Sequence, residues 1–174
     1  MAPATEEQLL RVVQARINEL RLWNEGVYLE TTTGIPLAEL HDRAVVDRLV
    51  LAERFLSAAG SLMRTRPPRY RDAISRYYYA MYHSVRAATL YHYNGDDHEE
   101  HSTLQKMVPP DLPDVEKWKN ALKNARLRRN SADYDPYPAH EAAWRAQAAQ
   151  LRTESTDLVG VVRAYLVSKG CRFV

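Results

Sequence analysis

Apolar residues recur every three or four positions over almost the whole chain, and proline or glycine interrupts the pattern at only a few places. This spacing gathers apolar side chains on one face of an α-helix, so it predicts helices rather than strands. Helices are expected at residues 5–23, 37–63, 70–93, 99–107, 114–130 and 139–168. Helices joined by such short breaks predict an all-α bundle.

The expected ends of these helices carry recognisable signals. Thr5, followed three residues later by Gln8, is typical of a capped helix start. Asn94-Gly95 and Gly170 are typical of helix ends. Residues 25–36 contain two glycines, a proline and several β-branched residues, and could form either a loop or a short hairpin. This run separates an N-terminal extension, residues 1–40, from a bundle at residues 41–170.

Composition excludes several classes of protein. A chain of 174 residues suits one domain with a short extension. Its only cysteine is Cys171, which excludes both a disulfide framework and a four-cysteine zinc site. No stretch approaches 18 uncharged apolar residues, so no membrane span is expected. The acidic start does not resemble a signal peptide, and a cytoplasmic location is predicted.

Basic residues are clustered although the formal net charge is only +2. Five arginines and one acid lie in residues 64–76, and six basic residues and one acid lie in residues 116–130. Such clusters on a near-neutral chain indicate a polyanionic partner such as RNA. The alternative is that each cluster is only a solvated helix face.

The helix at 114–130 has an unusual inward face. Val115, Trp118, Leu122 and Ala125 form an apolar stripe, and the next position on that stripe is Arg129. A buried guanidinium needs a partner, because an unpaired buried charge is very costly. The partner could be a structural carboxylate or a ligand phosphate. The candidate carboxylates are those of Asp133, Asp135 and Glu141.

Histidines offer two further possibilities. His83 lies among tyrosines in the helix at 70–93, and alone it is interpreted as a structural histidine rather than a catalyst. His98 and His101 lie three apart beside Glu99 and Glu100, a spacing that could hold a metal. Their polar, acidic context favours a solvent-exposed helix start instead, so no metal and no cofactor are expected.

Three motifs together resemble a known family. Tyr-Tyr-Ala-Met-Tyr-His at 78–83, His-Ser-x-Leu at 101–104 and Arg-Asn-Ser-Ala-Asp-Tyr-Asp-Pro at 129–136 occur in this order. They resemble the HEPN superfamily (higher eukaryotes and prokaryotes nucleotide-binding), in its branch with Tyr-Tyr-Ala-Met-Phe-His and Ala-Asp-Tyr-Asp-Pro segments. The resemblance covers about residues 43–167.

The resemblance implies an up-and-down bundle of four to five helices, here with an N-terminal helical extension, that commonly forms a homodimer. Many HEPN proteins are metal-independent ribonucleases of toxin–antitoxin, phage-defence or CRISPR systems, and others are inactive modules that bind RNA or nucleotides. Many are encoded beside a minimal nucleotidyltransferase antitoxin. By resemblance, that enzyme could adenylylate Tyr134 or Tyr137. Active members carry an arginine and, after four to six intervening residues, a histidine, which two chains bring together across a cleft.

This sequence departs from that pattern, because the positions where the histidine would stand after Arg129 hold Tyr134, Asp135 and Pro136. Metal-free RNA cleavage needs a general base and a general acid, roles that histidine fills near neutral pH. A tyrosine, with a pKa near 10, is about a thousandfold short of base at pH 7. His83 or His101 could substitute if the fold brings one of them into the cleft.

Three functions follow from these observations. The first is an RNA- or nucleotide-phosphate-binding protein of a toxin–antitoxin or defence system, with a degenerate motif. The second is an active metal-independent endoribonuclease with a non-standard base. The third is a non-catalytic subunit that docks a partner protein, possibly through residues 5–23. The candidate catalytic residues are Arg129, Asn130 and Tyr134, and the candidate RNA- or phosphate-binding residues are Lys119, Lys123, Arg126, Arg128, Asp133 and His83.

Overall fold

The computed structural model describes residues 5–94, 100–137 and 140–174. In these residues it is helical with no strand, as predicted. The chain divides into two units, Met1–Leu40 and His41–Val174. No helix in the described part of the chain has the length and apolar character needed to cross a bilayer.

The N-terminal unit contains α1 (Glu6–Gln14) and α2 (Ile17–Thr33) where the sequence predicts one helix at 5–23. The predicted capping box is present, because the Gln8 N–H donates to the Thr5 hydroxyl and the Thr5 N–H donates to Oε1 of Gln8. Ala15 has an extended backbone that ends α1. A second helix then starts, with Glu19 accepting a hydrogen bond from the N–H of Arg16.

Residues 25–36 form neither the loop nor the hairpin that their composition suggests. The helix α2 continues through them to Thr33 and ends at Gly34, whose φ is +67°. The hydroxyls of Thr31, Thr32 and Thr33 each donate to a carbonyl four residues earlier. This bonding satisfies the threonine side chains inside a helix, so their presence does not break it.

The C-terminal unit is a helical bundle. It contains nearly all of α3 (Leu37–Met63), then α4 (Tyr70–Tyr93), α5 (His101–Leu104), α6 (Val115–Tyr134) and α7 (Glu141–Ser168). The predicted helix at 99–107 is therefore shorter, the one at 114–130 runs four residues further, and Asn94 and Gly170 adopt positive φ at helix ends. Gly95 and residues 138–139 lie outside the described residues.

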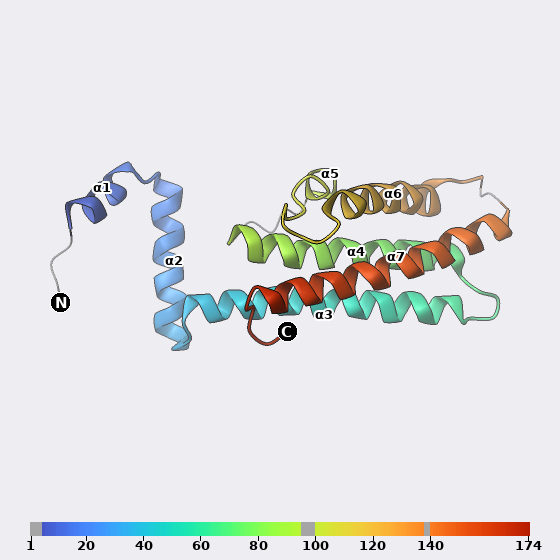
Figure 1. Ribbon diagram of the computed structural model, residues 1–174, viewed down its shortest axis with the longest axis horizontal. Coiled ribbons are helices and arrows are strands. Elements are labelled where there is room, and N and C mark those ends of the chain that lie inside the picture. Colours follow the sequence, from blue (N-terminus) through green and yellow to red (C-terminus); the bar gives the residue numbers. More distant parts are fainter. Residues whose placement is uncertain (1–4, 95–99, 138–139) are drawn as a thin grey trace. The chain divides into compact units, whose positions relative to one another are not determined.

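The helix α4 is the centre of this bundle. Figure 1 shows α6 along one side of α4, with α3 and α7 along the other. Fourteen residues of α4 are buried, on more than the single face that the sequence pattern predicts. A helix that is covered over most of its surface needs small residues where its neighbours approach closely. In α4 these are Ala73, Ala80, Ser84, Ala87 and Ala88.

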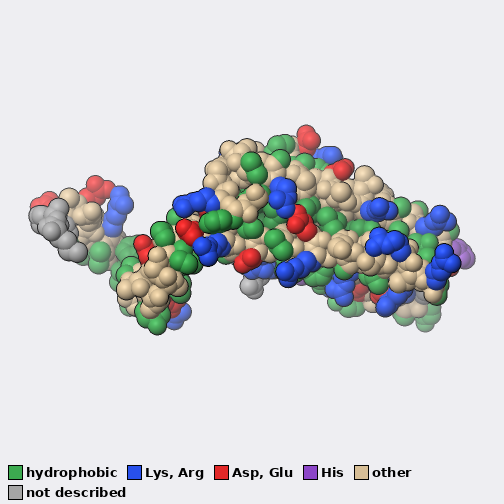
Figure 2. Space-filling model, turned by 90° about the horizontal axis from the view of Figure 1, so that it is seen from below, with side chains coloured by type: hydrophobic (Ala, Val, Ile, Leu, Met, Phe, Trp, Pro, Cys, Tyr) green, Lys and Arg blue, Asp and Glu red, His purple; other side chains and the backbone are tan. Residues whose placement is uncertain are grey.

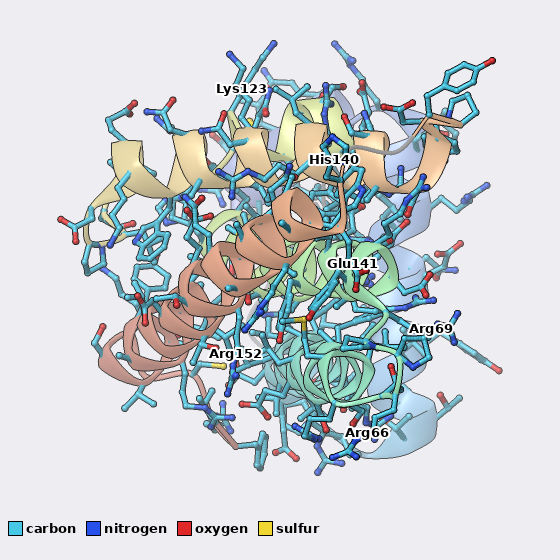
Figure 3. All side chains as sticks on the ribbon, turned by 90° about the vertical axis from the view of Figure 1, so that its right-hand side faces the viewer. Arg66, Arg69, Lys123, His140, Glu141 and Arg152 are labelled. Atoms are coloured by element: carbon cyan, nitrogen blue, oxygen red, sulfur yellow. The ribbon has the colours of Figure 1, made fainter. Side chains whose placement is uncertain are left out.

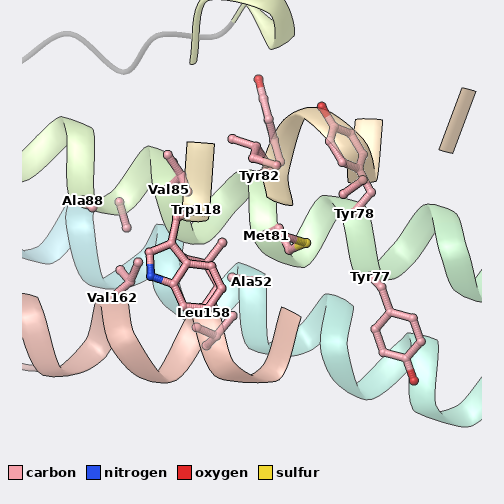
Figure 4. Packing of buried hydrophobic residues seen from close by; sticks show 14 of the residues in the cluster. Ala52, Tyr77, Tyr78, Met81, Tyr82, Val85, Ala88, Trp118, Leu158 and Val162 are labelled. Carbon is pink, nitrogen blue, oxygen red and sulfur yellow. The ribbon is translucent and has the colours of Figure 1, made fainter. Parts of the chain in front are cut away.

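Large side chains from the neighbouring helices fill the space around α4. Trp118 of α6 reaches between α4 and α7, beside Leu158 and Val162 (Figure 4). Ala52 of α3 lies in the same cluster, and Trp118 and Leu158 are almost completely buried. The core therefore joins side chains from four helices.

We expect Leu158→Ala to lower the free energy of unfolding by about 2–5 kcal/mol, because it leaves a cavity in a fully buried site. Val167→Ala, at an exposed site on the same helix, should change it by less than about 0.5 kcal/mol. Urea denaturation followed by circular dichroism measures both values. Equal losses in the two variants would contradict this description of the core.

Candidate nucleic-acid interface

The side chain of Arg129 lies where the sequence predicts it, on the inward face of α6 beyond buried Trp118, Leu122 and Ala125. Its side chain is only 18% exposed. The Nε atom lies 2.8 Å from Oδ2 of Asp133, one helical turn further on. Of the carboxylates considered from the sequence, the one paired with Arg129 is therefore that of Asp133.

Two tyrosines enclose the other side of the Arg129 guanidinium. Its Nη2 donates to the hydroxyl of Tyr79 at 2.8 Å, and its Nη1 donates to Oδ1 of Asn130 at 3.2 Å and to the Tyr134 hydroxyl at 3.5 Å. The guanidinium carbon lies 5.5 Å from the ring centre of Tyr79 and 5.3 Å from that of Tyr134, within cation–π range.

These neighbours keep Arg129 charged. Burial lowers its pKa, but the charge and hydrogen bond of Tyr79, with Asp133 and Tyr134, outweigh burial and raise the pKa above its ordinary value. Asp133 also accepts a hydrogen bond from the hydroxyl of Ser75 on α4, at 3.3 Å. The cation is thus fixed on one side by the protein, while exposed Asn130 and Tyr134 border its other side.

His101 on α5 lies in the same aromatic cluster. Its Nδ1 is 2.5 Å from the Tyr78 hydroxyl, and its ring centre is 4.3 Å from that of Tyr82 and 6.2 Å from that of Tyr79. Tyr79 therefore contacts both His101 and Arg129. The fold places one of the two histidines that could replace the missing motif histidine beside the motif arginine.

The pKa of His101 is lowered, first by burial and then by the positive charges of Arg129, Arg126 and Arg86. A neutral imidazole at pH 7 follows, and burial raises the pKa of Tyr78, which keeps its hydroxyl protonated. His101 can act as a base at Nε2 only in the tautomer in which Nδ1–H donates to the oxygen of Tyr78.

The other basic residues predicted on α6 do not all face the Arg129 cluster. Arg126 is half-buried beside the Arg129 cluster, and its Nε has no hydrogen-bond partner among the described residues. Arg128 instead faces α7, where it lies 3.9 Å from Glu154. Lys119 pairs with Glu116 on its own helix, and Lys123 points into solvent from α6 (Figure 3).

His83 packs against α3 rather than joining the Arg129 cluster directly. Its ring is stacked on Phe55 at 5.3 Å and on the Arg129 partner Tyr79 at 6.3 Å. Tyr134 and Tyr137, the two candidate modification sites, are 70% and 88% exposed. Both are therefore accessible to a modifying enzyme.

Sequence reasoning missed two contributors to this cluster. Tyr79 binds Arg129 from a position 50 residues away, and the periodicity of α4 gave no sign of that contact. Arg86 is a buried arginine on α4, and its guanidinium carbon lies 5.3 Å from the ring centre of Tyr82. No cluster of three or more potential metal ligands exists within the described residues, and His98 and Glu99 lie outside them.

Comparison with known families bears on this arrangement. The HEPN domain family matches residues 45–169, which is more than half of the chain and close to the span of the predicted resemblance. The chain belongs to the HEPN family. HEPN domains often form dimers and bind RNA, and the family indicates a function related to RNA or nucleotides. Searches of curated proteins and of solved structures found no match.

The surroundings of His101 predict a pH dependence of stability in this HEPN domain. Unfolded histidine has a pKa of about 6.5, and that of folded His101 is lower. Well above pH 6.5 both states are neutral, so His101 contributes no pH dependence there. As the pH falls, the unfolded chain binds the proton first and stability is lost.

We therefore expect acid to destabilise the wild type more than His101→Gln, which cannot titrate but can still hydrogen-bond to Tyr78. Urea denaturation of both proteins between neutral and mildly acidic pH measures the difference. Parallel loss of stability in the two proteins would show that His101 is not desolvated as described.

Proposed function

We propose that the cluster around Arg129 binds the phosphate backbone of RNA, as part of a toxin–antitoxin or defence system. The observation that carries the proposal is a guanidinium held in place by Asp133 and Tyr79 that borders exposed Asn130 and Tyr134. Arginine in a fixed orientation suits phosphate, and the exposed ring of Tyr134 offers a surface on which a base can stack.

The surrounding charges support the same ligand. Arg126 lies close enough to act on His101 and Tyr78, and its Nε is unpaired among the described residues. A phosphate near Arg129 would also lie near this second cation. The family's tendency to form dimers favours a homodimer, in which two such clusters would line one cleft.

Binding through Arg129 predicts a ranked set of affinities for RNA. Arg129→Ala should weaken binding by about 10- to 100-fold, the usual cost of losing charged hydrogen bonds. Arg129→Lys should recover only part of the loss, since lysine keeps the charge but cannot form the planar fork. Lys123→Ala should cause a smaller loss, independent of RNA sequence, and reduce the salt slope by about one.

Fluorescence anisotropy at several salt concentrations measures these affinities. Arg145→Ala, at an exposed arginine of α7, is the matched control and should leave binding unchanged. An affinity that does not fall with salt would contradict electrostatic binding. Wild-type affinity in Arg129→Ala would place any RNA elsewhere, and no RNA binding at all would favour the docking subunit.

That docking alternative has its own supporting observation. The N-terminal unit carries large apolar side chains that are at least half exposed, on both of its helices. Single exposed apolar residues are ordinary, but a concentration of them is typical of protein-binding surfaces. These residues are Leu9, Leu10, Val12, Val13, Ile17, Leu22, Trp23, Val27 and Tyr28.

A ribonuclease is the second candidate function, and the position of His101 favours it. In such a reaction a base removes the proton of a 2′-hydroxyl, whose oxygen attacks phosphorus and expels the protonated 5′-oxygen. A neutral His101 could accept the first proton, and Arg129 would stabilise the added negative charge on the phosphorane. The imidazolium formed on His101 then donates this proton, directly or through water, to the leaving 5′-oxygen, and His101 returns to its neutral form.

If the protein cleaves RNA, it should do so in the presence of a chelator. Arg129→Ala and His101→Gln should each lose at least about 100-fold in rate, and Lys117→Ala, at an exposed lysine of α6, should not. Cleavage of total cellular RNA provides the measurement. Activity that survives in His101→Gln would eliminate this histidine as the base.

The intact mass of the same preparation distinguishes two reasons for inactivity. An added adenylyl group on Tyr134 or Tyr137, absent after Tyr→Phe substitution, would identify a nuclease silenced by modification. Adenylylation of Tyr134 would put a phosphate beside Arg129, since their side chains lie 3.5 Å apart. If the protein is unmodified and still inactive, RNA binding without cleavage is the role that remains.

A further inference from the structure

A second basic site lies on the other side of α4. A cavity of about 300 Å³ lies between α3 and α7, and Tyr77 of α4 forms part of its wall. Ser57, Gly60 and Arg64 line it from α3 and the residue after that helix, and Arg152 and Thr156 line it from α7. Figure 3 shows Arg152 between the ribbons of these two helices.

The charge in this cavity is not balanced by the protein. No acidic residue lines it, and neither Arg64 nor Arg152 has an acidic partner within ion-pair distance among the described residues. Arg64 is held by a hydrogen bond from its Nη2 to the hydroxyl of Ser61 at 3.2 Å. This face of the bundle carries many lysine and arginine side chains (Figure 2).

The hydroxyl of Tyr77 is an independent sign that something binds here. Tyr77 is only 1% exposed, and its oxygen has no hydrogen-bond partner among the described residues. A buried hydroxyl without a partner is costly. Burial raises the pKa of Tyr77, although the charges of Arg152 and Arg64 act to lower it, so the group is a protonated donor.

The three donors could share one ligand. The buried phenol O–H lacks an acceptor, and two exposed guanidiniums line the same space. A tetrahedral anion with several oxygens can accept hydrogen bonds from all three. Gly60 lines this space, and a Cβ at this position would be in van der Waals contact with Nη1 of Arg64, at 3.4 Å. We propose that the cavity between Arg64, Tyr77 and Arg152 binds a phosphate group.

This site is separate from the Arg129 cluster and does not rest on the function proposed there. Tyr77 and Tyr78 are adjacent in sequence, but their side chains leave α4 on opposite sides (Figure 4). Tyr78 bonds to His101, whereas Tyr77 points toward α3. The phosphate could be free or could belong to a nucleotide or to the end of a nucleic acid, and the experiment distinguishes these sources.

Isothermal titration of the full chain with inorganic phosphate is the first test. Arg64→Gln and Arg152→Gln should each weaken phosphate binding by at least about tenfold, and Tyr77→Phe by about three- to tenfold. Arg54→Gln, at an exposed arginine of α3 outside the cavity, should have no effect. Arg129→Ala should also leave phosphate binding intact, even where it abolishes binding of RNA.

Gly60→Leu provides a variant that fills the cavity without changing its charge, and it should abolish phosphate binding while thermal unfolding shows a folded protein. No heat from millimolar phosphate with the wild type would overturn the proposal. An equal loss of phosphate binding in Arg54→Gln and Arg152→Gln would show that general surface charge, not the cavity, attracts the phosphate. Loss of phosphate binding in Arg129→Ala would show that the phosphate binds at the Arg129 cluster instead.

Three further titrations identify the source of the phosphate. A 5′-phosphorylated oligonucleotide that binds more tightly than both its 5′-hydroxyl form and inorganic phosphate would indicate a nucleic-acid end. AMP binding more tightly than either phosphate or the oligonucleotide would indicate a free nucleotide. Each result must be lost in Arg152→Gln, since a preference that survives this substitution arises elsewhere and counts against the cavity.

Discussion

The burial of α4 over most of its surface is the constraint on which the rest of the bundle depends. Because α6 packs on one side of this helix and α3 and α7 on the other, consecutive side chains must contact different neighbours. Alanines and a serine allow close packing, and the tyrosines between them bring polar hydroxyls into the interior. Each hydroxyl then requires a partner. Tyr78 and Tyr79 find theirs in His101 and Arg129, whereas Tyr77 has none among the described residues.

Arg129 shows how such a structure can hold a cation without neutralising it completely. An unpaired guanidinium at 18% exposure would carry a desolvation cost, and Asp133 offsets part of it. The carboxylate engages the Nε side, and Tyr79 engages Nη2. The remaining contacts, to Asn130 and Tyr134, are the two longest hydrogen bonds and involve exposed residues. A ligand oxygen can replace them with little reorganisation of the core.

The sequence predicts the bundle well because most of its helices carry an apolar repeat, and glycine, proline or a capping residue marks several of their ends. The prediction fails at residues 25–36, because threonine residues usually favour a loop or strand. Here the threonine hydroxyls donate to backbone carbonyls of their own helix, which lets the helix continue. The sequence also predicts Arg129, since a charge on an apolar stripe is visible in one helix. It does not predict Tyr79 or the place of His101, because both depend on contacts between segments more than 20 residues apart.

Charge decides how far the cluster supports catalysis. The Asp133 carboxylate cancels much of the potential of Arg129, and a neutral His101 adds none. Within one chain, Arg126 is a nearby cation whose Nε has no partner among the described residues. That charge suffices to attract a phosphodiester, which carries one negative charge. A phosphorane carries more, and its stabilisation gains from any further cation placed within a few ångströms. A second copy of the chain would supply one, so cleavage, unlike binding, should require two copies facing each other.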